Sequence, residues 1–309
     1  MSRTCRTPLP SSCAWARAWS PSSPPPPGRS RPAARSTAPS PGRSGTPRSH
    51  SPPPASGPRS CPVGDDGFGR FLTAELRAHG VDDRAVEVDP VAPTGLYVKE
   101  LSPRTDGAVD GTMHYYRAGS AAAALSPGSL ESPVATELLA AAALVHTSGI
   151  TPALSPSARA AQEALVAAPR PGRLVSFDLN WRPALWRGRE DEGRALLTDL
   201  AHRADIVFCT RPDAEAVFGT SAPDDLRTLF PEPRYLVVTD PAGAVAFDGA
   251  ERAASDALDV PVVETIGAGD AFAAGFLAGV LTGLTLGGSL ARAHRIATRA
   301  ITSTRDHVD

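Results

Sequence analysis

The chain has 309 residues and a formal net charge of −2, but its charges are divided unevenly along the sequence. Residues 1–62 contain nine Arg and no Asp, Glu or Lys, so residues 63–309 hold 22 basic and 33 acidic side chains. An acidic body is a poor match to a general nucleic-acid-binding protein, which needs a basic surface. The length allows one large domain or two small ones with an ample core.

Cysteine usage and hydropathy narrow the class of protein further. Cys5, Cys13, Cys61 and Cys209 form no CxxC pair, which argues against a disulfide framework or a zinc knuckle and fits a reducing cytoplasm. The longest apolar run, 271–281, is far shorter than the roughly 18 residues that a membrane span needs. The histidines include no HxxxH pair, so no tightly bound transition metal is expected. We therefore expect a soluble, cytoplasmic protein.

Residues 1–62 differ from the rest of the chain, because 16 Pro and 14 Ser dominate them. They show neither helical nor strand periodicity, and such a composition cannot bury enough apolar surface to offset the entropy of ordering. Three interpretations stay open: a disordered tail, an Arg- and Ser-rich transit peptide, or GC-rich coding DNA translated in the wrong frame. A secretory signal is excluded because Arg17 interrupts the weakly apolar patch at 13–19. The frame hypothesis would explain why order begins abruptly at Val63.

The first elements after Val63 are a helix and a hairpin. Residues 69–80 place apolar side chains at helical spacing and end on a Gly, a normal helix stop. Residues 94–100 and 111–119 are strand-like runs joined by the turn-rich segment 101–110, which predicts a β-hairpin. A hairpin alone is marginally stable in water, so it needs further strands or a partner.

Short apolar runs then alternate with helical stretches. Strands are predicted at 143–148, 173–180, 205–209 and 234–240, and helices at 157–168 and 190–203. This alternation indicates an α/β fold with a parallel sheet covered on both faces. Ligands of open α/β sheets sit beyond the carboxyl ends of the strands, so the hairpin at about 94–119 would form a lid over that edge.

Arginines and phenols supply candidate substrate contacts. In FDLNWRPALW (177–186), the proline biases Arg182 to an extended backbone, so its guanidinium can reach outward to a carboxylate or phosphate. In the hairpin, Tyr97, Tyr115 and Arg117 add two phenols and a second guanidinium, with Tyr115 and Arg117 on one face. Two arginines and several hydroxyl groups suit a polyol that carries an acid group. The alternatives are a surface Arg beside packing tryptophans and an ordinary half-buried strand pair.

TRPDAEAVFG (210–219) follows another predicted strand. Its Asp213 and Glu215 could hold Mg²⁺ directly or through water, although carboxylates that start a helix are the commoner case. His146 is expected to be a strand residue rather than a ligand.

The segment VVETIGAGDAFAAGF (262–276) contains the most specific motif. The glycines let successive N–H groups turn towards one point, and the following helix adds its positive end, which together make an anion site. Asp270, in the first turn of that helix, is placed to accept a proton from an attacking hydroxyl during phosphoryl transfer. The alternative is that Asp270 serves only the helix dipole. GxxxxGK[ST] is absent, and Phe272 occupies the third-glycine position of the dinucleotide fingerprint.

Together these segments resemble the ribokinase-like, or PfkB, family of carbohydrate kinases. ETIGAGDAFAAGF is similar to the family's C-terminal signature, with Glu264 in place of the usual Asp, and VGDDGFGRFLTAELRAHGV (63–81) resembles an earlier family block. TGLYVKE, HYYRAGSAAAAL and FDLNWRPALW are most similar to the 2-dehydro-3-deoxygluconate (KDG) kinases. The resemblance implies a ribokinase-like three-layer α/β sandwich over 63–309, with a mostly parallel sheet and a β lid commonly shared across a dimer.

The resemblance also implies an activity: ATP- and Mg²⁺-dependent phosphorylation of a sugar-acid hydroxyl. Asp270 would be the base, and Gly267, Ala268 and Gly269 the anion hole. Substrate contacts would come from Tyr97, Tyr115, Arg117 and Arg182, nucleotide contacts from Asn180, Thr239, Gly243, Gly267 and Gly269, and a metal contact from Asp213.

The chain departs from the family pattern in three places. Thr210 stands where the family has the Asn of an acidic motif, and 237–247 lacks the first glycine of the nucleotide loop. The family's opening strand and sugar-binding segment are not recognisable in 1–62. A fructokinase- or ribokinase-type enzyme and a catalytically impaired fragment therefore remain alternatives. A nucleotide-dependent oxidoreductase is opposed by the missing fingerprint.

Overall fold

A central sheet organises the computed structural model, which describes residues 62–103, 109–168, 171–260, 262 and 267–302. Among these residues the sheet has six strands in the order β10-β9-β8-β7-β6-β5. The strands are β5 (Leu144–Ser148), β6 (Leu174–Asp178), β7 (Ile206–Thr210), β8 (Tyr235–Asp240), β9 (Gly243–Asp248) and β10 (Glu251–Asp256). β5 to β8 run parallel, whereas β9 and β10 add an antiparallel edge. The four predicted strands and the mostly parallel sheet are confirmed, but β9 and β10 were not predicted.

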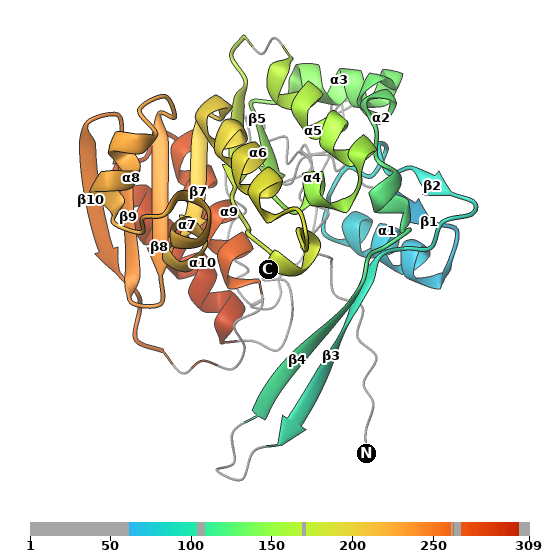
Figure 1. Ribbon diagram of the computed structural model, residues 1–309, viewed down its shortest axis with the longest axis horizontal. Coiled ribbons are helices and arrows are strands. Elements are labelled where there is room, and N and C mark those ends of the chain that lie inside the picture. Colours follow the sequence, from blue (N-terminus) through green and yellow to red (C-terminus); the bar gives the residue numbers. More distant parts are fainter. Residues whose placement is uncertain (1–61, 104–108, 169–170, 261, 263–266, 303–309) are drawn as a thin grey trace, which may run out of the picture.

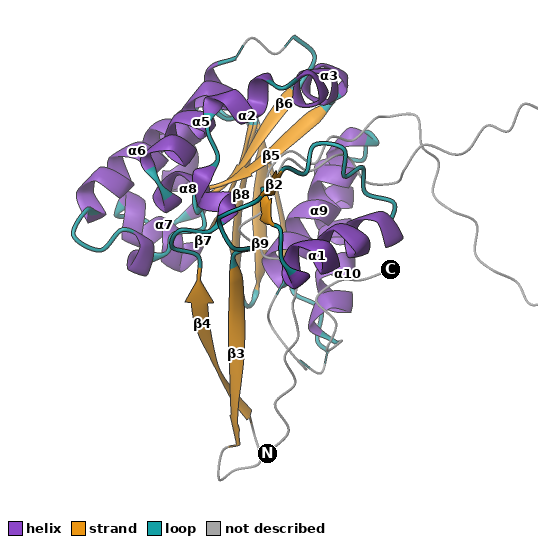
Figure 2. Ribbon diagram, turned by 90° about the vertical axis from the view of Figure 1, so that its right-hand side faces the viewer, coloured by secondary structure: helices purple, strands orange, loops and turns teal. Residues whose placement is uncertain are grey.

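Helices cover both faces of the sheet, as Figure 2 shows edge-on. One face carries α5 (Pro156–Ala167), α6 (Glu190–Arg203), α7 (Arg211–Phe218) and α8 (Pro223–Leu229). The other carries α9 (Ala268–Leu281) and α10 (Leu286–Ile301), with α1 (Gly67–Ala78) beside them. A separate apolar cluster fills each interface: Phe177, Leu197 and Leu236 belong to the first, and Phe208 and Phe276 to the second. The chain is therefore a three-layer sandwich.

The long apolar stretch of α9 packs directly on α10. The Cβ of an Ala at position 275 would lie 2.7 Å from the Cα of Ala293, so Gly275 allows the two backbones to approach closely. Phe276 is fully buried and packs edge-on against Phe208 of β7, with ring centroids 5.6 Å apart. These contacts anchor the helix whose first turn carries Asp270.

A second, smaller unit lies next to the open β5 edge of the sheet. β1 (Val63–Gly64) and β2 (Val88–Asp89) form a parallel pair, and within the described residues this pair is not hydrogen-bonded to the six-stranded sheet. Asp66 caps α1 by accepting hydrogen bonds from the backbone N–H groups of Phe68 and Gly69. Asp66 also accepts from Thr94, which ties α1 to the base of the hairpin.

The hairpin projects beyond the carboxyl ends of the strands in Figures 1 and 2. It consists of β3 (Leu96–Pro103) and β4 (Val109–Tyr116), which pair antiparallel with Tyr97 opposite Tyr115. Both strands are shifted towards the turn relative to the prediction, because the ladder continues into the segment that we expected to be a turn, 101–110. The predicted strand ends rested on the turn propensity of residues 101–110, and pairing between the two backbones overrides that propensity.

The remaining elements are short and connect these parts: η2 (Ala121–Ala124), α2 (Pro127–Glu131), α3 (Pro133–Ala141), α4 (Thr151–Leu154) and η3 (Pro183–Leu185). Across the described part of the chain, none of the helices combines the length and the apolar character needed to cross a bilayer.

Candidate active site

Three neighbouring strands bring their carboxyl ends to one edge of the sheet. The register pairs Asp178 of β6 with Phe208 of β7, and Thr210 at the end of β7 with Thr239 of β8. The loops that follow these strands therefore start side by side, although they lie about 30 residues apart in sequence. The candidate residues predicted from separate motifs meet at this edge.

Arg182 is held in a defined position after β6. Its Nη2 donates to Oδ1 of Asn180 at 2.8 Å, and its Nη1 donates to the carbonyl of Trp181 at 2.8 Å. The same Nη1 lies 3.7 Å from Oδ2 of Asp213, in the first turn of α7. Trp181 and Trp186 are both buried and stack on each other, so the expectation that tryptophans pack beside Arg182 is also correct. The guanidinium retains N–H groups that can bind a ligand.

Asp178 is the carboxyl group most strongly affected by its surroundings. Burial, the largest cause, and the negative charges of Asp270 and Asp213 together raise its pKa to about 7. Arg182 and a hydrogen bond from Asn180 oppose this shift. Although α9 lies far from β6 in sequence, the fold brings Asp270 into electrostatic contact with the end of β6. Groups with such perturbed pKa values cluster at functional sites.

The hairpin contributes a second guanidinium to the same edge. Arg117 is 8% exposed, and its Cζ lies 4.3 Å from the centre of the Tyr115 ring. Tyr115 and Arg117 therefore share one face of the hairpin, as predicted. Tyr97 lies on the same face, since its ring centre is 6.0 Å from that of Tyr115. Burial lowers the pKa of Arg117, and the positive charge of Arg182 lowers it further. The two arginines are thus close enough to interact electrostatically at this edge of the sheet.

The glycine turn forms the start of α9. Gly267 is the N-cap with φ of 77°, a left-handed conformation that favours glycine, and Asp270 lies half-buried in the first turn. Gly269 is exposed, and an added Cβ there would meet nothing within 4 Å. Glu264 lies outside the described residues. The backbone N–H groups at this helix start and the helix dipole favour an anion here.

The altered loop between β8 and β9 is a two-residue turn. Asp240 pairs with Gly243 across it, and Oδ1 of Asp240 accepts the N–H groups of Ala242 (2.7 Å) and Gly243 (3.1 Å). Oδ2 of Asp240 forms an ion pair with Nε of Arg211 at 2.6 Å. A side chain at Gly243 would collide with the carbonyl of Ser255, so packing against β10 requires this glycine. Thr239 lies beside Cys209 at the same edge.

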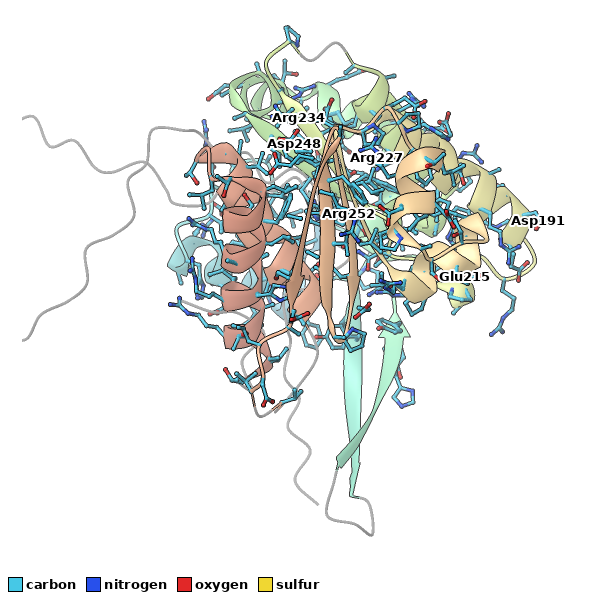
Figure 3. The ribbon with its side chains drawn as sticks, turned by 90° about the vertical axis from the view of Figure 1, so that its left-hand side faces the viewer. Asp191, Glu215, Arg227, Arg234, Asp248 and Arg252 are labelled. Carbon is cyan, nitrogen blue, oxygen red and sulfur yellow. The ribbon has the colours of Figure 1, made fainter. Side chains whose placement is uncertain are left out.

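Asp213 and Glu215 offer carboxylate oxygens that suit Mg²⁺, but Asp213 already lies beside Arg182. Nη1 of Arg182 lies 3.7 Å from Oδ2 of Asp213. Burial raises the pKa of Asp213, and the charge of Arg182 and the nearby Thr210 and Trp181 oppose the rise. Glu215 is exposed on α7 (Figure 3). In the described segments, no group of three or more His, Cys, Asp or Glu residues is placed to hold a metal ion. Mg²⁺ is often held by one or two carboxylates together with substrate phosphates and water, and Asp213 fits that mode.

Comparison with known proteins identifies the family. The pfkB family carbohydrate kinase model matches residues 60–307. This chain belongs to the PfkB family. The 2-dehydro-3-deoxygluconokinase of Thermoproteus tenax is 36% identical over 226 residues, covering 72% of this chain and 66% of that enzyme. Fructokinase-1 of Oryza sativa subsp. japonica is 35% identical over 219 residues, covering 70% of this chain and 65% of that protein.

Solved PfkB structures share this architecture. The PfkB protein from Polaromonas sp. JS666 superposes with a TM-score of 0.70 at 29% identity, covering 80% of each chain. The match spans just under two thirds of the length of the T. tenax and rice relatives. The expected family and the ribokinase-like fold are thus confirmed for this PfkB chain.

Asp178 is the site residue that sequence reasoning missed. Its segment, FDLN, was singled out only for Asn180 and for the arginine that follows it. The available signal was an acid at the end of a largely apolar strand, at the edge where open α/β sheets bind ligands. That signal did not predict the proximity of Asp178 to Asp270, which depends on how α9 packs on the sheet.

Proposed function

We propose that this PfkB chain transfers the terminal phosphoryl group of ATP to a hydroxyl of a sugar acid, with 2-dehydro-3-deoxy-D-gluconate as the substrate. The observation that carries the proposal is the proximity of two like charges, Arg117 and Arg182. Arg117 is buried, senses the charge of Arg182, and has no carboxylate within ion-pair distance among the described residues. Buried charges are normally paired, so a substrate carboxylate is the missing partner.

In the proposed mechanism Asp270 accepts the proton of the attacking hydroxyl. It lies at the start of α9, so the N–H groups that follow Gly267 and the helix dipole can stabilise charge on the transferring phosphoryl group. Arg182 lies close enough to Asp213 and Asp178 to sense both. It therefore serves as a cation between the substrate acid and the phosphates. Such transfer depends chiefly on positioning and electrostatic stabilisation.

Mg²⁺ would neutralise the phosphates of the bound nucleotide. Asp213 supplies the carboxylate, with the phosphates and water completing the ligand set. Asn180, Thr239, Gly243 and Gly269 lie in loops or at element ends around the same edge, which supports their proposed nucleotide contacts.

A coupled assay with ATP and Mg²⁺ tests this proposal, with KDG, fructose and ribose as acceptors. We expect turnover with KDG, and a loss of most turnover in Asp270→Asn with nucleotide and sugar binding retained. Arg117→Met should raise the KM for KDG by about 10- to 100-fold, because a charge-assisted contact is worth roughly 1.5–3 kcal/mol. Near-full activity of Asp270→Asn would overturn the role of Asp270 as the base.

A fructokinase activity is the second candidate, because the rice fructokinase is almost as similar to this chain as the T. tenax enzyme. A neutral sugar has no carboxylate for Arg117 to bind. Turnover with fructose that Arg117→Met leaves unchanged would favour this candidate.

We also propose a homodimer through the hairpin, since a two-stranded ribbon needs a partner to be stable.

A further inference from the structure

The backbone at Asn180 adopts a costly conformation. Its φ is 42°, and among the described residues Asn180 is the only non-glycine with a positive φ. Left-handed backbone costs about 1–2 kcal/mol for an ordinary residue and less for Asn. Such strain persists only where the surrounding contacts determine it. The contacts here lie on both sides of Asn180: Asp178 precedes it by two residues, and Arg182 follows it by two.

The chemistry of the three side chains determines which way the Asn180 amide faces. A guanidinium can only donate hydrogen bonds, so the Asn180 atom that lies 2.8 Å from Nη2 of Arg182 must be the carbonyl Oδ1. The NH₂ end is then the part of the amide that remains to interact with Asp178, whose pKa the Asn180 side chain lowers. Asp178 therefore orients the amide that receives Arg182.

The start of this chain of contacts is attached to the sheet. The carbonyl of Asp178 accepts the N–H of Gly149 at 2.8 Å, and the N–H of Leu179 donates to the carbonyl of Phe208 at 2.9 Å. A Cβ at Gly149 would lie 2.1 Å from the carbonyl oxygen of Leu179, so the segment after β5 presses directly on this backbone. Arg182 itself has a side chain that is 44% exposed. The contacts that run from the end of β6 through Asp178 and Asn180 to Arg182 form a relay. This relay links an exposed, long side chain to a rigid strand end.

We propose that Asp178 and Asn180 are positioning residues, which hold the guanidinium of Arg182 ready for the anionic part of its ligand. Neither has to touch the sugar, because both act on it through Arg182. A long Arg side chain otherwise loses rotamer entropy each time that it binds, and pre-ordering it removes this cost from the binding step. The identity of the anion, a sugar carboxylate or a phosphate, rests on the proposed function; the relay itself does not.

Alanine and asparagine substitutions at position 178 distinguish the effect of losing the hydrogen-bond acceptor from the effect of losing the negative charge. Asp178→Ala leaves the Asn180 amide free to rotate, so we expect kcat/KM to fall about tenfold, as is typical when a partner behind a functional group is lost. Asp178→Asn keeps an oxygen acceptor and should restore most of that loss. Asn180→Gly keeps the left-handed backbone without strain but removes the amide, and should match Asp178→Ala. Asp191→Ala, at an exposed position on α6, is the control for a lost surface carboxylate.

A double-mutant cycle with Arg182→Met tests whether Asp178 acts through Arg182. In that background Asp178→Ala should change kcat/KM by less than twofold, because the group that it positions is absent. An undiminished tenfold loss in the Arg182→Met background would overturn the relay and assign Asp178 a direct role. An Asp178→Ala enzyme with wild-type kcat/KM would also overturn it. A fall in Tm that accompanies the activity loss equally in Asp178→Asn would indicate a purely structural residue and contradict the proposal.

The cycle uses KDG or fructose, whichever the unmodified chain phosphorylates, so a wrong substrate leaves the test intact. If neither sugar is phosphorylated, the proposed function fails, and a crystal structure of Asp178→Ala tests the relay separately. We expect the Arg182 guanidinium to leave Asn180 in that variant. A guanidinium that stays within hydrogen-bond distance of Oδ1 of Asn180 would show that Asp178 does not position it.

Discussion

At the scale of single residues, the group with the clearest pH-dependent behaviour is Asp178. Its pKa in the folded chain is about 7, whereas the ordinary value is 3.8. Between these two pH values the folded state binds more protons at this site than the unfolded state does. The contribution of Asp178 to stability therefore falls as the pH rises from about 4 to 7, and above pH 7 the cost is fully present.

We expect the free energy of unfolding of Asp178→Asn to depend less on pH, because an amide carries no charge at any pH. The gain over the unmodified chain should be about 1–2 kcal/mol at pH 8 and close to zero at pH 4, with partial exposure to water limiting the effect. Urea unfolding at both pH values measures this difference. Asp191→Asn, on the exposed surface of α6 (Figure 3), is the matched control. Equal gains at pH 4 and pH 8 would contradict the assignment.

At the scale of elements, the packing of α9 on α10 determines where Asp270 lies. Gly275→Ala would place a Cβ 2.7 Å from the backbone of Ala293, so the helices must separate. We expect a loss of about 1–3 kcal/mol in the free energy of unfolding. A fall in kcat should accompany it, since the first turn of α9 would shift. Thermal unfolding and the coupled assay measure the two effects.

Gly287→Ala is the control for this substitution. Gly287 lies exposed in the first turn of α10, and a Cβ there meets nothing within 4 Å. Its higher helix propensity should make this variant neutral or slightly more stable. If Gly275→Ala behaved like Gly287→Ala, the close helix contact would not be what positions α9.

At the scale of the whole molecule, the hairpin has two different faces. Tyr97, Tyr115 and Arg117 share one face, next to Arg182. The opposite face exposes Val98 (42% exposed) and Tyr116 (61% exposed). In the part of the chain that the structure describes, no other strand pairs with this ribbon, so its exposed apolar side chains indicate a surface for a partner.

We expect the chain to sediment as a dimer, and the double variant Val98→Ser, Tyr116→Ser to sediment as a monomer. Val91→Ser removes an even more exposed apolar side chain (90%), which lies outside the hairpin, and should leave the dimer unchanged. Analytical ultracentrifugation compares the three proteins. A monomeric unmodified chain would exclude dimerisation through the hairpin.

A charge pair at the opposite end of the sheet lies outside the candidate site. Arg234 and Asp248 form a double hydrogen bond at 2.8 and 3.0 Å, and Figure 3 places them away from the hairpin. The candidate residues gather at the other end, so the two ends of the sheet have different roles.

The wrong-frame hypothesis for residues 1–62 stays a prediction, since these residues lie outside the described part of the chain.

The sequence by itself determined the alternating strands and helices, the hairpin and the acid at the start of α9. These features depend on local periodicity, turn residues and a short motif, all of which act over a few residues. The predicted helix at 190–203 coincides with α6 for this reason. The ends of β3 and β4 did not follow local propensity, because pairing between strands extended them.

Only the tertiary structure decided which of these residues meet. The proximity of Asp178 to Asp270, and of Arg117 to Arg182, joins segments about 65 to 90 residues apart in sequence. No local pattern encodes such distances, because they follow from strand order in the sheet and from the close packing of α9 on α10. The raised pKa of Asp178 has the same origin: burial and neighbouring charges exist only after the strands and helices have assembled.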